Sequence, residues 1–440
     1  MRYSLWTMPK LHVEGGRPLS GTIAVSGAKN AASKMVLASL LTDETVSIAN
    51  LPRQQETDIA KEIAETLGAS FAFTGEHEAD IRAERISSTS VIGLSRKNRL
   101  SILAIAPLLH RAKEAYVPKV GGDKIGPRPV DFHLDLLEKM GAKIEETPEG
   151  YRASVSGRLK GTLIELPYPS VGATESALFA GVLAEGRTVI RNAAGEPEVK
   201  ALVMMLQNMG AVIQILTRRT IEIHGVPRLR GCSVSVMPDR IEAASYGSLA
   251  LATGGDIFIA GAQHEHLITF LNAVRRVGAD YAVQPDGILV RGAGKLRAIE
   301  LETDTHPGFA TDWQQPFVAA LTRAEGTSIV HETVYEDRFG YTEALNRMGA
   351  DIAVSATCLG ETPCRFAGRN HRHSAIIKGP TPLHGADVAI PDIRAGLAFV
   401  VAALMAEGES ILSGLEHLDR GYERLEEKLL GVGAKIRREE

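Results

Sequence analysis

The sequence has little of what marks secreted, membrane-spanning or disulfide-rich proteins. Three cysteines, Cys232, Cys358 and Cys364, are spread over 440 residues, which argues against a disulfide framework and predicts free thiols. The longest uncharged apolar run, residues 395–406, is shorter than the roughly 20 residues that cross a bilayer, so we expect a buried helix there. The N-terminus lacks the apolar stretch and cleavage site of a secretory signal. We therefore expect a cytoplasmic protein without a membrane partner.

Charge of one sign and aromatic residues are also scarce. The formal net charge is -4, and aromatic residues make up 5% of the chain. Neither a broad basic surface nor a stacking platform for nucleic acid is therefore expected, whereas small anionic ligands remain candidates. Hydrophobic residues make up 44% of the sequence. They suffice for two cores, and the length exceeds the size at which a single core keeps growing.

A repeated pattern runs through the whole chain. A helical stripe of apolar residues ends in Gly-Ala six times, roughly 70 residues apart, at Gly68, Gly141, Gly210, Gly278, Gly349 and Gly433. Glycine takes the left-handed conformation that closes a helix at the least steric cost. Each glycine precedes a short run typical of a strand, such as AVIQIL or ADIAV. We predict six copies of one repeat.

A second helix is expected in each repeat, and its first residues divide the repeats into two sets of three. Serine precedes this helix in the first set and aspartate in the second, and both are preferred N-caps. The boundary falls near Met237. Because the first two strands precede the first repeat, they can complete the second domain, and we divide the chain into residues 29–237 and residues 1–28 with 238–440. The expected caps are Ser26, Ser95, Ser170, Asp239, Asp312 and Asp392.

These helix starts have the chemistry of an anion site. Backbone N–H groups and the helix dipole favour phosphate or carboxylate at a helix N-terminus. Lys29, Asn30 and Arg99 lie at the starts of the first set, and we expect starts of both sets to converge where the domains face each other. Arginines at further expected helix starts match carboxylate or phosphate oxygens in pairs; they are Arg128, Arg338 and Arg420. The residues thus predict a small, multiply charged anionic ligand.

Nine segments, taken together, resemble the enolpyruvyl transferases, and within them the branch that acts on UDP-N-acetylglucosamine. The resemblance covers essentially the whole chain and implies an α/β fold of two inside-out α/β barrels, each built from three βαβαββ repeats around buried helices. The repeat count reached from the glycines agrees with this fold. The segments are SGAKN, GGDKIGPRPVD, PSVGATES, NAAGEPE, MPDRIE, HPGFATDWQQ, ETVYEDRF, DIRAG and LDRGYER, in that order.

The resemblance implies transfer of the enolpyruvyl group of phosphoenolpyruvate to the 3-hydroxyl of UDP-N-acetylglucosamine. The hydroxyl attacks C2 while C3 is protonated, and phosphate then leaves a tetrahedral ketal, in the first committed step of peptidoglycan synthesis. Such a path needs a base, an acid and fixed cations. No cofactor and no metal are implied, and the sequence carries no signal for the oligomeric state.

Site residues follow from the resemblance position by position. Lys29, Arg128 and Arg420 resemble the cations on the phosphate side, and Arg338 with Arg394 the partners of the carboxylate. Asp312 resembles the carboxylate at the sugar 3-hydroxyl, a candidate base. The catalytic set implied is Asp123, Asp312, Lys29 and Arg420. The residues implied to contact the UDP-sugar are Asn30, Arg99, Arg128, Pro129, Val130, Asp131, Phe132, Ser170, Val171, Gly172, Asp312 and Val334.

The main departure from the family pattern is Asp123, where most members carry a cysteine. Fosfomycin alkylates that thiol, and a carboxylate is a much poorer nucleophile, so we expect resistance to the drug. To act as an acid near neutral pH, Asp123 would need a raised pKa. Smaller departures, the segment TES after SVGA and Ala310 in GFATDW, leave the sugar specificity open.

Several alternatives remain at this point. The three aspartates can be N-caps alone, the arginines ordinary surface residues, and Asp123 a turn residue. The acceptor can be shikimate 3-phosphate or another nucleotide, or the chain can be a paralogue that binds a sugar nucleotide without turnover. A further cluster, Cys358, Cys364, His371 and His373, fits no usual zinc spacing and predicts a polar loop.

Overall fold

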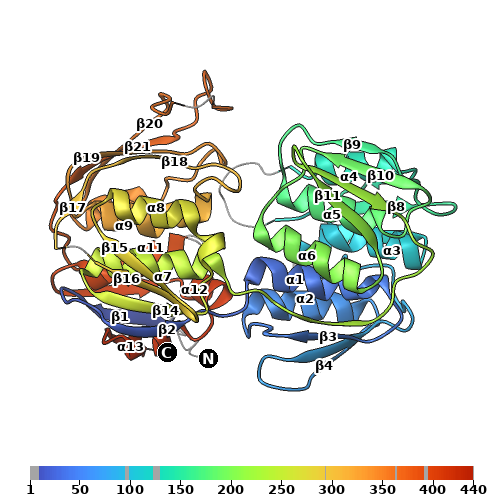
Figure 1. Ribbon diagram of the computed structural model, residues 1–440, viewed down its shortest axis with the longest axis horizontal. Helices are drawn as coiled ribbons and strands as arrows, with labels where there is room; N and C mark the ends of the chain where they lie inside the picture. The colour runs from blue at the N-terminus through green and yellow to red at the C-terminus, as the bar shows by residue number, and fades with distance from the viewer. Residues whose placement is uncertain are drawn as a thin grey trace, which may run out of the picture. The chain divides into compact units, whose positions relative to one another are not determined.

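The computed structural model describes residues 9–94, 99–121, 129–292, 294–361, 364–390 and 395–439 (Figure 1). Contacts divide the described residues into two compact units. We name them the Lys29 unit, which lies within residues 27–237, and the Asp312 unit, formed by the described part of residues 9–26 and 238–439. Among the described helices, none is both long enough and apolar enough to cross a membrane.

All six repeat glycines close a helix, as predicted. Each of them has a positive φ, between 88° and 109°, the left-handed region that favours glycine. The helices before them are α2 (Gln55–Thr66), α4 (Asp131–Lys139), α6 (Pro197–Asn208), α8 (Ile268–Arg276), α10 (Thr342–Arg347) and α13 (Leu425–Gly431). The strands after them are β4 (Ser70–Phe73), β7 (Lys143–Glu146), β11 (Val212–Leu216), β15 (Asp280–Gln284), β20 (Asp351–Ser355) and β24 (Lys435–Glu439).

The Lys29 unit contains three sheets. Their strand orders are β13-β3-β5-β4, β6-β8-β7 and β11-β12-β10-β9. A strand from the end of the unit, β13, pairs in parallel with β3 from its beginning, which closes the unit on itself. The strands not yet given are β3 (Val46–Ala49), β5 (Ala79–Arg82), β6 (Glu114–Pro118), β8 (Gly150–Ser154), β9 (Leu163–Glu165), β10 (Arg187–Arg191), β12 (Thr220–His224) and β13 (Cys232–Ser235).

The Asp312 unit also contains three sheets, and the two N-terminal strands belong to them. The strand β1 pairs with β23 and β24, and β2 pairs with β14. The strand orders are β22-β23-β1-β24, β15-β16-β14-β2 and β17-β19-β21-β20, with β18 beside β19. The strands not yet given are β1 (Lys10–Glu14), β2 (Gly21–Ala24), β14 (Asp256–Ala260), β16 (Gly287–Arg291), β17 (Leu296–Arg297), β18 (Glu300–Glu302), β19 (Ala324–His331), β21 (Ser374–Gly379), β22 (Asp387–Ala389) and β23 (Glu409–Ser413).

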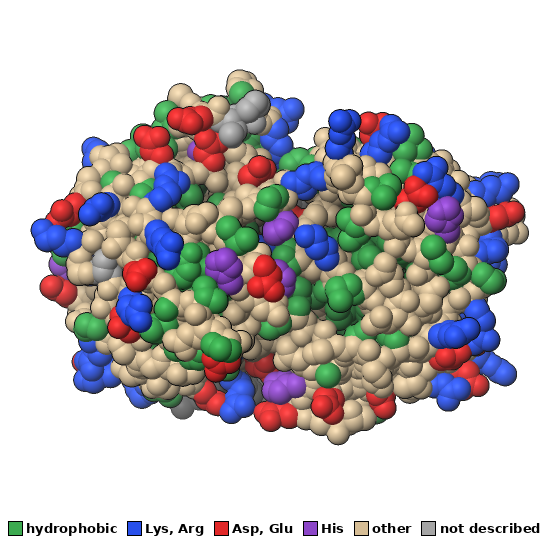
Figure 2. Space-filling view, in the orientation of Figure 1, with side chains coloured by type: hydrophobic (Ala, Val, Ile, Leu, Met, Phe, Trp, Pro, Cys, Tyr) green, Lys and Arg blue, Asp and Glu red, His purple; other side chains and the backbone are tan. Residues whose placement is uncertain are grey.

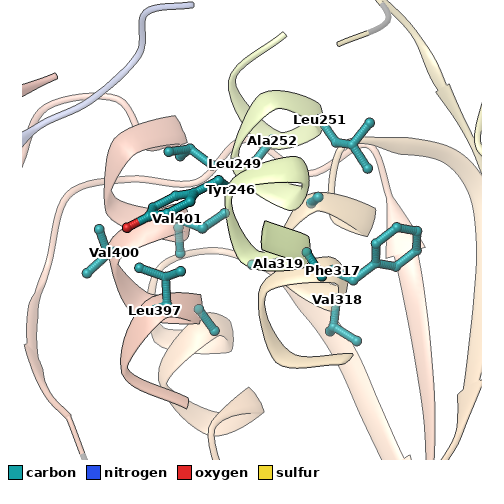
Figure 3. Close-up of a cluster of buried hydrophobic side chains, with 14 of the residues drawn as sticks. Tyr246, Leu249, Leu251, Ala252, Phe317, Val318, Ala319, Leu397, Val400 and Val401 are labelled. Atoms are coloured by element: carbon teal, nitrogen blue, oxygen red, sulfur yellow. The ribbon is translucent and has the colours of Figure 1, made fainter. Parts of the chain in front are cut away.

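Three helices fill the centre of the Asp312 unit. They are α7 (Arg240–Thr253), α9 (Gln314–Leu321) and α11 (Ala395–Met405), and each packs against the other two. Figure 3 shows Tyr246, Phe317 and Val401, one from each helix, in a single apolar cluster. All 14 residues of α7 are buried, which is typical of a helix enclosed on every side. The predicted buried helix over the apolar run 395–406 is confirmed as α11.

The Lys29 unit repeats this plan with α1 (Lys29–Ala38), α3 (Ile105–Arg111) and α5 (Val171–Gly181). A short 3₁₀ turn, η2 (Leu100–Ala104), leads into α3 and contacts both α1 and α5. With helices inside and sheets around them, the expected mixed α/β fold of repeated units is confirmed. On the face shown in Figure 2, basic and acidic side chains are interspersed without a broad patch of one sign.

The predicted N-caps have mixed outcomes. Ser170 caps α5 by accepting from Ala173 N, and Asp239 caps α7 by accepting from Ile241 N and Glu242 N. The predictions for Ser26 and Asp312 are wrong, because α1 begins three residues after Ser26 and the Asp312 carboxylate bonds to an arginine instead. Ser95 and Asp392 lie outside the described residues.

Glu175, the middle residue of the segment TES that departs from the family pattern, lies within the core of the Lys29 unit. Its residue surface is 2% exposed, so it is a core position rather than a surface contact. Burial raises the pKa of the Glu175 carboxyl to about 7, with Lys34 opposing the rise and Glu198 and Glu196 adding to it. The folded state therefore holds this proton more tightly than the unfolded chain, whose carboxyl titrates near 4.5. Stability falls as the pH rises through this window.

We predict that E175Q stabilises the protein at pH 8 and has little effect near pH 3, about 1.5 units below the unfolded pKa, where the wild-type carboxyl is protonated in both states. The expected gain at pH 8 is about 3 kcal/mol, from the size of the pKa shift. Urea denaturation at the two pH values measures it. E185Q, which changes an exposed carboxylate, is the control. An equal change at both pH values would mean that ionisation of Glu175 does not set the effect.

Candidate functional site

Lys29 occupies an electrostatically unfavourable position at the start of α1. It is the first residue of the helix, and it is 9% exposed. The helix dipole disfavours a cation at an N-terminus, and lysine is seldom this buried. Ala28, at the N-cap, has no side chain that bonds the first N–H groups of α1. An anion bound at this helix start would be stabilised both by the ammonium group and by those N–H groups.

Most of the residues expected to contact the UDP-sugar lie at two adjacent helix starts of the Lys29 unit. The helices α4 and α5 pack against each other. The first begins at Asp131, preceded by Pro129 and Val130, and the second begins at Val171. Arg99 joins them, because its Nη2 donates to the carbonyl of Pro129 at 3.3 Å. The residues that the structure brings together here are Arg99, Pro129, Val130, Asp131, Phe132, Ser170, Val171 and Gly172.

His133 links α4 to α5 near their starts. The sequence analysis did not identify this residue. Its Nδ1 lies 2.7 Å from the hydroxyl oxygen of Ser176 in α5. A Cβ on Gly172 would lie 3.0 Å from His133 Cε1, so glycine permits this close approach. Burial lowers the pKa of His133 to about 3, and the charge of Arg99 lowers it further. The imidazole is therefore neutral. The only sequence signal was its place in the segment GPRPVDFH.

In the Asp312 unit, Asp312 and Arg338 form an ion pair. Arg338 Nη2 donates to Asp312 Oδ1 at 2.5 Å, and the arginine side chain is 1% exposed against 23% for the aspartate. With its amide oxygen turned toward the guanidinium, Gln315 accepts from Nε and Nη2 of Arg338. Asp312 lies in the turn η4 (Thr311–Trp313) directly before α9. The carboxylate is thus held in a fixed orientation with part of its surface accessible.

Glu332 ties this ion pair to the segment that follows β19. The residue has no exposed surface, and burial raises the pKa of its carboxyl while the charge of Arg338 opposes the rise. Four groups donate to the carboxylate: Thr311 Oγ1 at 2.9 Å, Gln314 Nε2 at 2.6 Å, Val334 N at 2.8 Å and Tyr335 N at 3.0 Å. The start of α9, Val334 and the approach to Arg338 therefore form one hydrogen-bonded assembly.

A second buried carboxylate, Glu242, organises the start of α7. It accepts from Ser26 N at 2.7 Å, Tyr246 Oη at 2.9 Å and Lys428 Nζ at 2.5 Å. Lys428 also donates to the hydroxyl of Ser26 at 2.8 Å. Ser26 is thus anchored to α7 and α13 within the Asp312 unit, instead of capping α1.

The remaining expected site residues have different outcomes. Arg420 was predicted to lie at a helix start, and this prediction is wrong. It lies in the last turn of α12 (Glu416–Gly421), where the helix dipole favours a cation. Asn30 follows Lys29 in α1 and is half-buried. Asp123, Arg128 and Arg394 lie outside the described residues, so their roles remain predictions.

Each unit therefore carries part of a set suited to charged substrates. The Lys29 unit presents a buried ammonium group and two polar helix starts. The Asp312 unit presents a carboxylate oriented by a buried guanidinium. Fixed donors of this kind stabilise negative charge on phosphate and carboxylate groups, and an oriented carboxylate can accept a proton from a hydroxyl group.

The chain is similar to known proteins over nearly its whole length. The family model described as EPSP synthase (3-phosphoshikimate 1-carboxyvinyltransferase) matches residues 13–429. The UDP-N-acetylglucosamine 1-carboxyvinyltransferase of Protochlamydia amoebophila is 47% identical over 98% of this chain and 94% of that protein. The enzyme of the same name from Chlamydia muridarum is 44% identical over 98% of both chains.

A solved structure is similar along its whole length. The enolpyruvyl transferase NikO from Streptomyces tendae superposes with a TM-score of 0.85 at 25% identity, covering 98% of this chain and 99% of that one. Similarity of this extent includes both units and all six repeats. The chain thus belongs to the EPSP synthase (3-phosphoshikimate 1-carboxyvinyltransferase) family of enolpyruvyl transferases.

Proposed function

We propose that this protein transfers the enolpyruvyl group of phosphoenolpyruvate to the 3-hydroxyl of UDP-N-acetylglucosamine, releasing phosphate, in the first committed step of peptidoglycan synthesis. The observation that carries the proposal is the full-length identity of 44–47% to enzymes named for this reaction. The acceptor is the part of the proposal that the family alone leaves open, since the family model is named for shikimate 3-phosphate chemistry.

The Lys29 unit would bind the acceptor. The starts of α4 and α5 present backbone N–H groups beside Arg99, which suits a nucleotide diphosphate. Ser170, Val171 and Gly172 form the start of α5, and His133 keeps α4 next to it. A neutral His133 adds no charge there, so Arg99 would supply the positive field. We also propose that the two units are two domains of the enzyme, divided after residues 28 and 237.

Phosphoenolpyruvate would be held by cations at both of its ends. We assign Lys29, Arg128 and Arg420 to the phosphate, and Arg338 with Arg394 to the carboxylate. A guanidinium offers five N–H donors, so Arg338 can orient Asp312 and Gln315 through Nη2 and Nε and still contribute to a substrate carboxylate. The burial of Lys29 and Arg338 strengthens such contacts, because water screens them less.

Asp312 would act as the base for the acceptor hydroxyl. Its carboxylate takes the proton as the hydroxyl oxygen forms a bond to C2 of phosphoenolpyruvate, and C3 gains a proton to give the ketal. Loss of a proton from C3 then restores the double bond as the C2–O bond to phosphate breaks. Asp123 would supply or relay the C3 proton, the role for which the family usually has a cysteine.

The acceptor is tested by measuring phosphate release from phosphoenolpyruvate with UDP-N-acetylglucosamine, shikimate 3-phosphate or UMP. We expect turnover with UDP-N-acetylglucosamine alone. Turnover with shikimate 3-phosphate or UMP instead would show that the protein acts on another acceptor and belongs to another branch of the family. Binding of UDP-N-acetylglucosamine without phosphate release would identify a non-catalytic paralogue.

We predict that D312N lowers kcat by about 10²–10⁴-fold, the usual contribution of a general base, while KM for phosphoenolpyruvate changes little. An amide keeps the size of the side chain but cannot take the proton. The matched control is D304N, which changes an exposed aspartate whose carboxylate accepts from Thr305 N. Phosphate release under saturating substrates gives kcat for each variant. A kcat for D312N close to the wild-type value would exclude Asp312 as the base.

We predict that fosfomycin causes no time-dependent inactivation of the wild-type enzyme and that D123C makes the enzyme sensitive. The substitution supplies a thiolate that can open the epoxide, which a carboxylate does far more slowly. Residual activity after incubation with the drug measures the effect, and mass spectrometry locates the adduct. D123S, which has no thiol, is the control. Inactivation of the wild type with an adduct on Asp123 would contradict the prediction.

A further inference from the structure

The segment between β20 and β21 projects beyond the ends of these strands (Figure 1) and carries two cysteines. Its described residues include Cys358, Cys364 and His373. The segment returns onto His331, the last residue of β19. Residues that are far apart in the sequence therefore meet at one end of the sheet β17-β19-β21-β20.

Four side chains at this end of the sheet form a compact Cys₂His₂ set. One ligand atom from each of His331, Cys358, Cys364 and His373 lies within 4.8 Å of the others. Cys358 Sγ and His373 Nε2 are 3.1 Å apart, and the rings of His331 and His373 have centroids 5.0 Å apart. Two thiolates and two imidazoles are a ligand set that Zn²⁺ prefers in structural sites.

Hydrogen bonds fix the tautomer of both histidines. His373 Nδ1 lies 2.6 Å from the carbonyl oxygen of His371, and because a carbonyl only accepts, Nδ1 carries the proton. The hydroxyl of Ser374 donates to the carbonyl of Thr357 at 2.7 Å, so at His331 it accepts from Nδ1 at 2.8 Å. Both imidazoles therefore keep an unprotonated Nε2, the form that binds a metal.

His331 provides an independent sign of a missing ligand. The residue is 1% exposed, and its Nε2 has no hydrogen-bond partner among the described residues. A buried acceptor without a partner costs free energy that proteins rarely leave uncompensated. A metal ion bound to Nε2 would satisfy this atom.

The packing around the four side chains is also specific. A Cβ on Gly360 would lie 2.5 Å from His331 Cδ2, so only glycine lets the segment pass this close to the ring. Phe366 N donates to Cys364 Sγ at 3.3 Å, a contact that stabilises thiolate charge. The Phe366 ring has no exposed surface and packs against His373.

We propose that His331, Cys358, Cys364 and His373 bind one Zn²⁺ ion in a tetrahedral structural site. The two histidines bind through Nε2. Each thiol releases its proton to solvent as its sulfur bonds to the metal, so binding frees two protons and changes no oxidation state. Four protein ligands leave no open position for substrate or water. The ion pins the segment between β20 and β21 to the end of β19.

This site would also support the candidate active site. Arg365, next to Cys364, donates to the carbonyl of Val334 and lies 3.7 Å from Glu336. Glu332 N donates to the carbonyl of His373 at 2.8 Å. The segment that carries the proposed ligands thus contacts the residues between β19 and Arg338, two of which donate to the Glu332 carboxylate. Zinc would hold that segment in place without touching the substrates.

The spacing of these residues explains why the sequence predicted a polar loop. The cysteines are too far apart for a usual zinc motif, and the fourth ligand is His331 on a distant strand rather than His371. The backbone carbonyl of His371 accepts a hydrogen bond from His373 Nδ1, and the His371 ring packs on Phe366. Only the pairing of β19 with β21 brings His331 and Ser374 together.

The test is the metal content of the full-length protein, purified without a histidine tag from zinc-supplemented medium. We expect about one zinc per chain in the wild type, in C232S and in H371A. The double variant C358S/C364S and the variant H331A should retain on the order of tenfold less. The pair H331A and H371A distinguishes the proposed ligand set from the one suggested by the sequence. Zinc that remains in C358S/C364S would overturn the site.

A second measurement on the wild type avoids variants that fail to fold. Removal of zinc by a chelator should expose Cys358 and Cys364 to alkylation, with no change at Cys232. Addition of Co²⁺ to the stripped protein should give a thiolate charge-transfer band and visible ligand-field bands. Equal alkylation with and without zinc, no cobalt spectrum, or a disulfide between Cys358 and Cys364 in the purified protein would each exclude the proposal.

Discussion

The buried carboxylate of Glu332 is the interaction on which the candidate site of the Asp312 unit depends. A carboxylate without exposed surface is costly unless its oxygens are fully hydrogen-bonded. Here a hydroxyl, an amide and two backbone N–H groups donate to it. These donors come from η4, the start of α9 and the segment after β19. One group therefore sets the distance between the turn that carries Asp312 and the segment that leads to Arg338.

The segment after β19 also contacts the proposed metal site. Its backbone is bonded to the region between β20 and β21 through His373 and Arg365, where we place the zinc ion. The Glu332 carboxylate and the proposed metal would thus both hold this stretch of chain in place. Held in this way, the segment would keep Arg338 paired with Asp312, and this pairing would orient the carboxylate that we propose as the base.

The sequence predicted the helices and repeats of the molecule better than the residues of its candidate site. The six glycines identified helix ends because a left-handed residue is a local requirement, and all six have positive φ. The apolar run of α11 and the caps Ser170 and Asp239 were also local signals. Asp312 was misjudged as a cap, because its partner Arg338 comes from the segment beyond β19, and no spacing within the helix predicts that contact.

The residues that sequence reasoning missed share this cause. His133 is defined by the packing of α4 on α5, and Glu332 and His331 by the hydrogen bonds around the end of β19. Each of the three acquires contacts with residues that are distant in the sequence. Lys29 shows the opposite case. Its place at a helix N-terminus breaks a local rule, and such a violation points to function where the rest of the sequence is consistent.

A crystal structure of the protein with UDP-N-acetylglucosamine bound would test the proposed site most directly. We expect a carboxylate oxygen of Asp312 within hydrogen-bond distance of the sugar 3-hydroxyl, with Arg338 still bonded to the same carboxylate. We also expect the starts of α4 and α5 to contact the nucleotide. A sugar bound with its 3-hydroxyl far from Asp312 would contradict it.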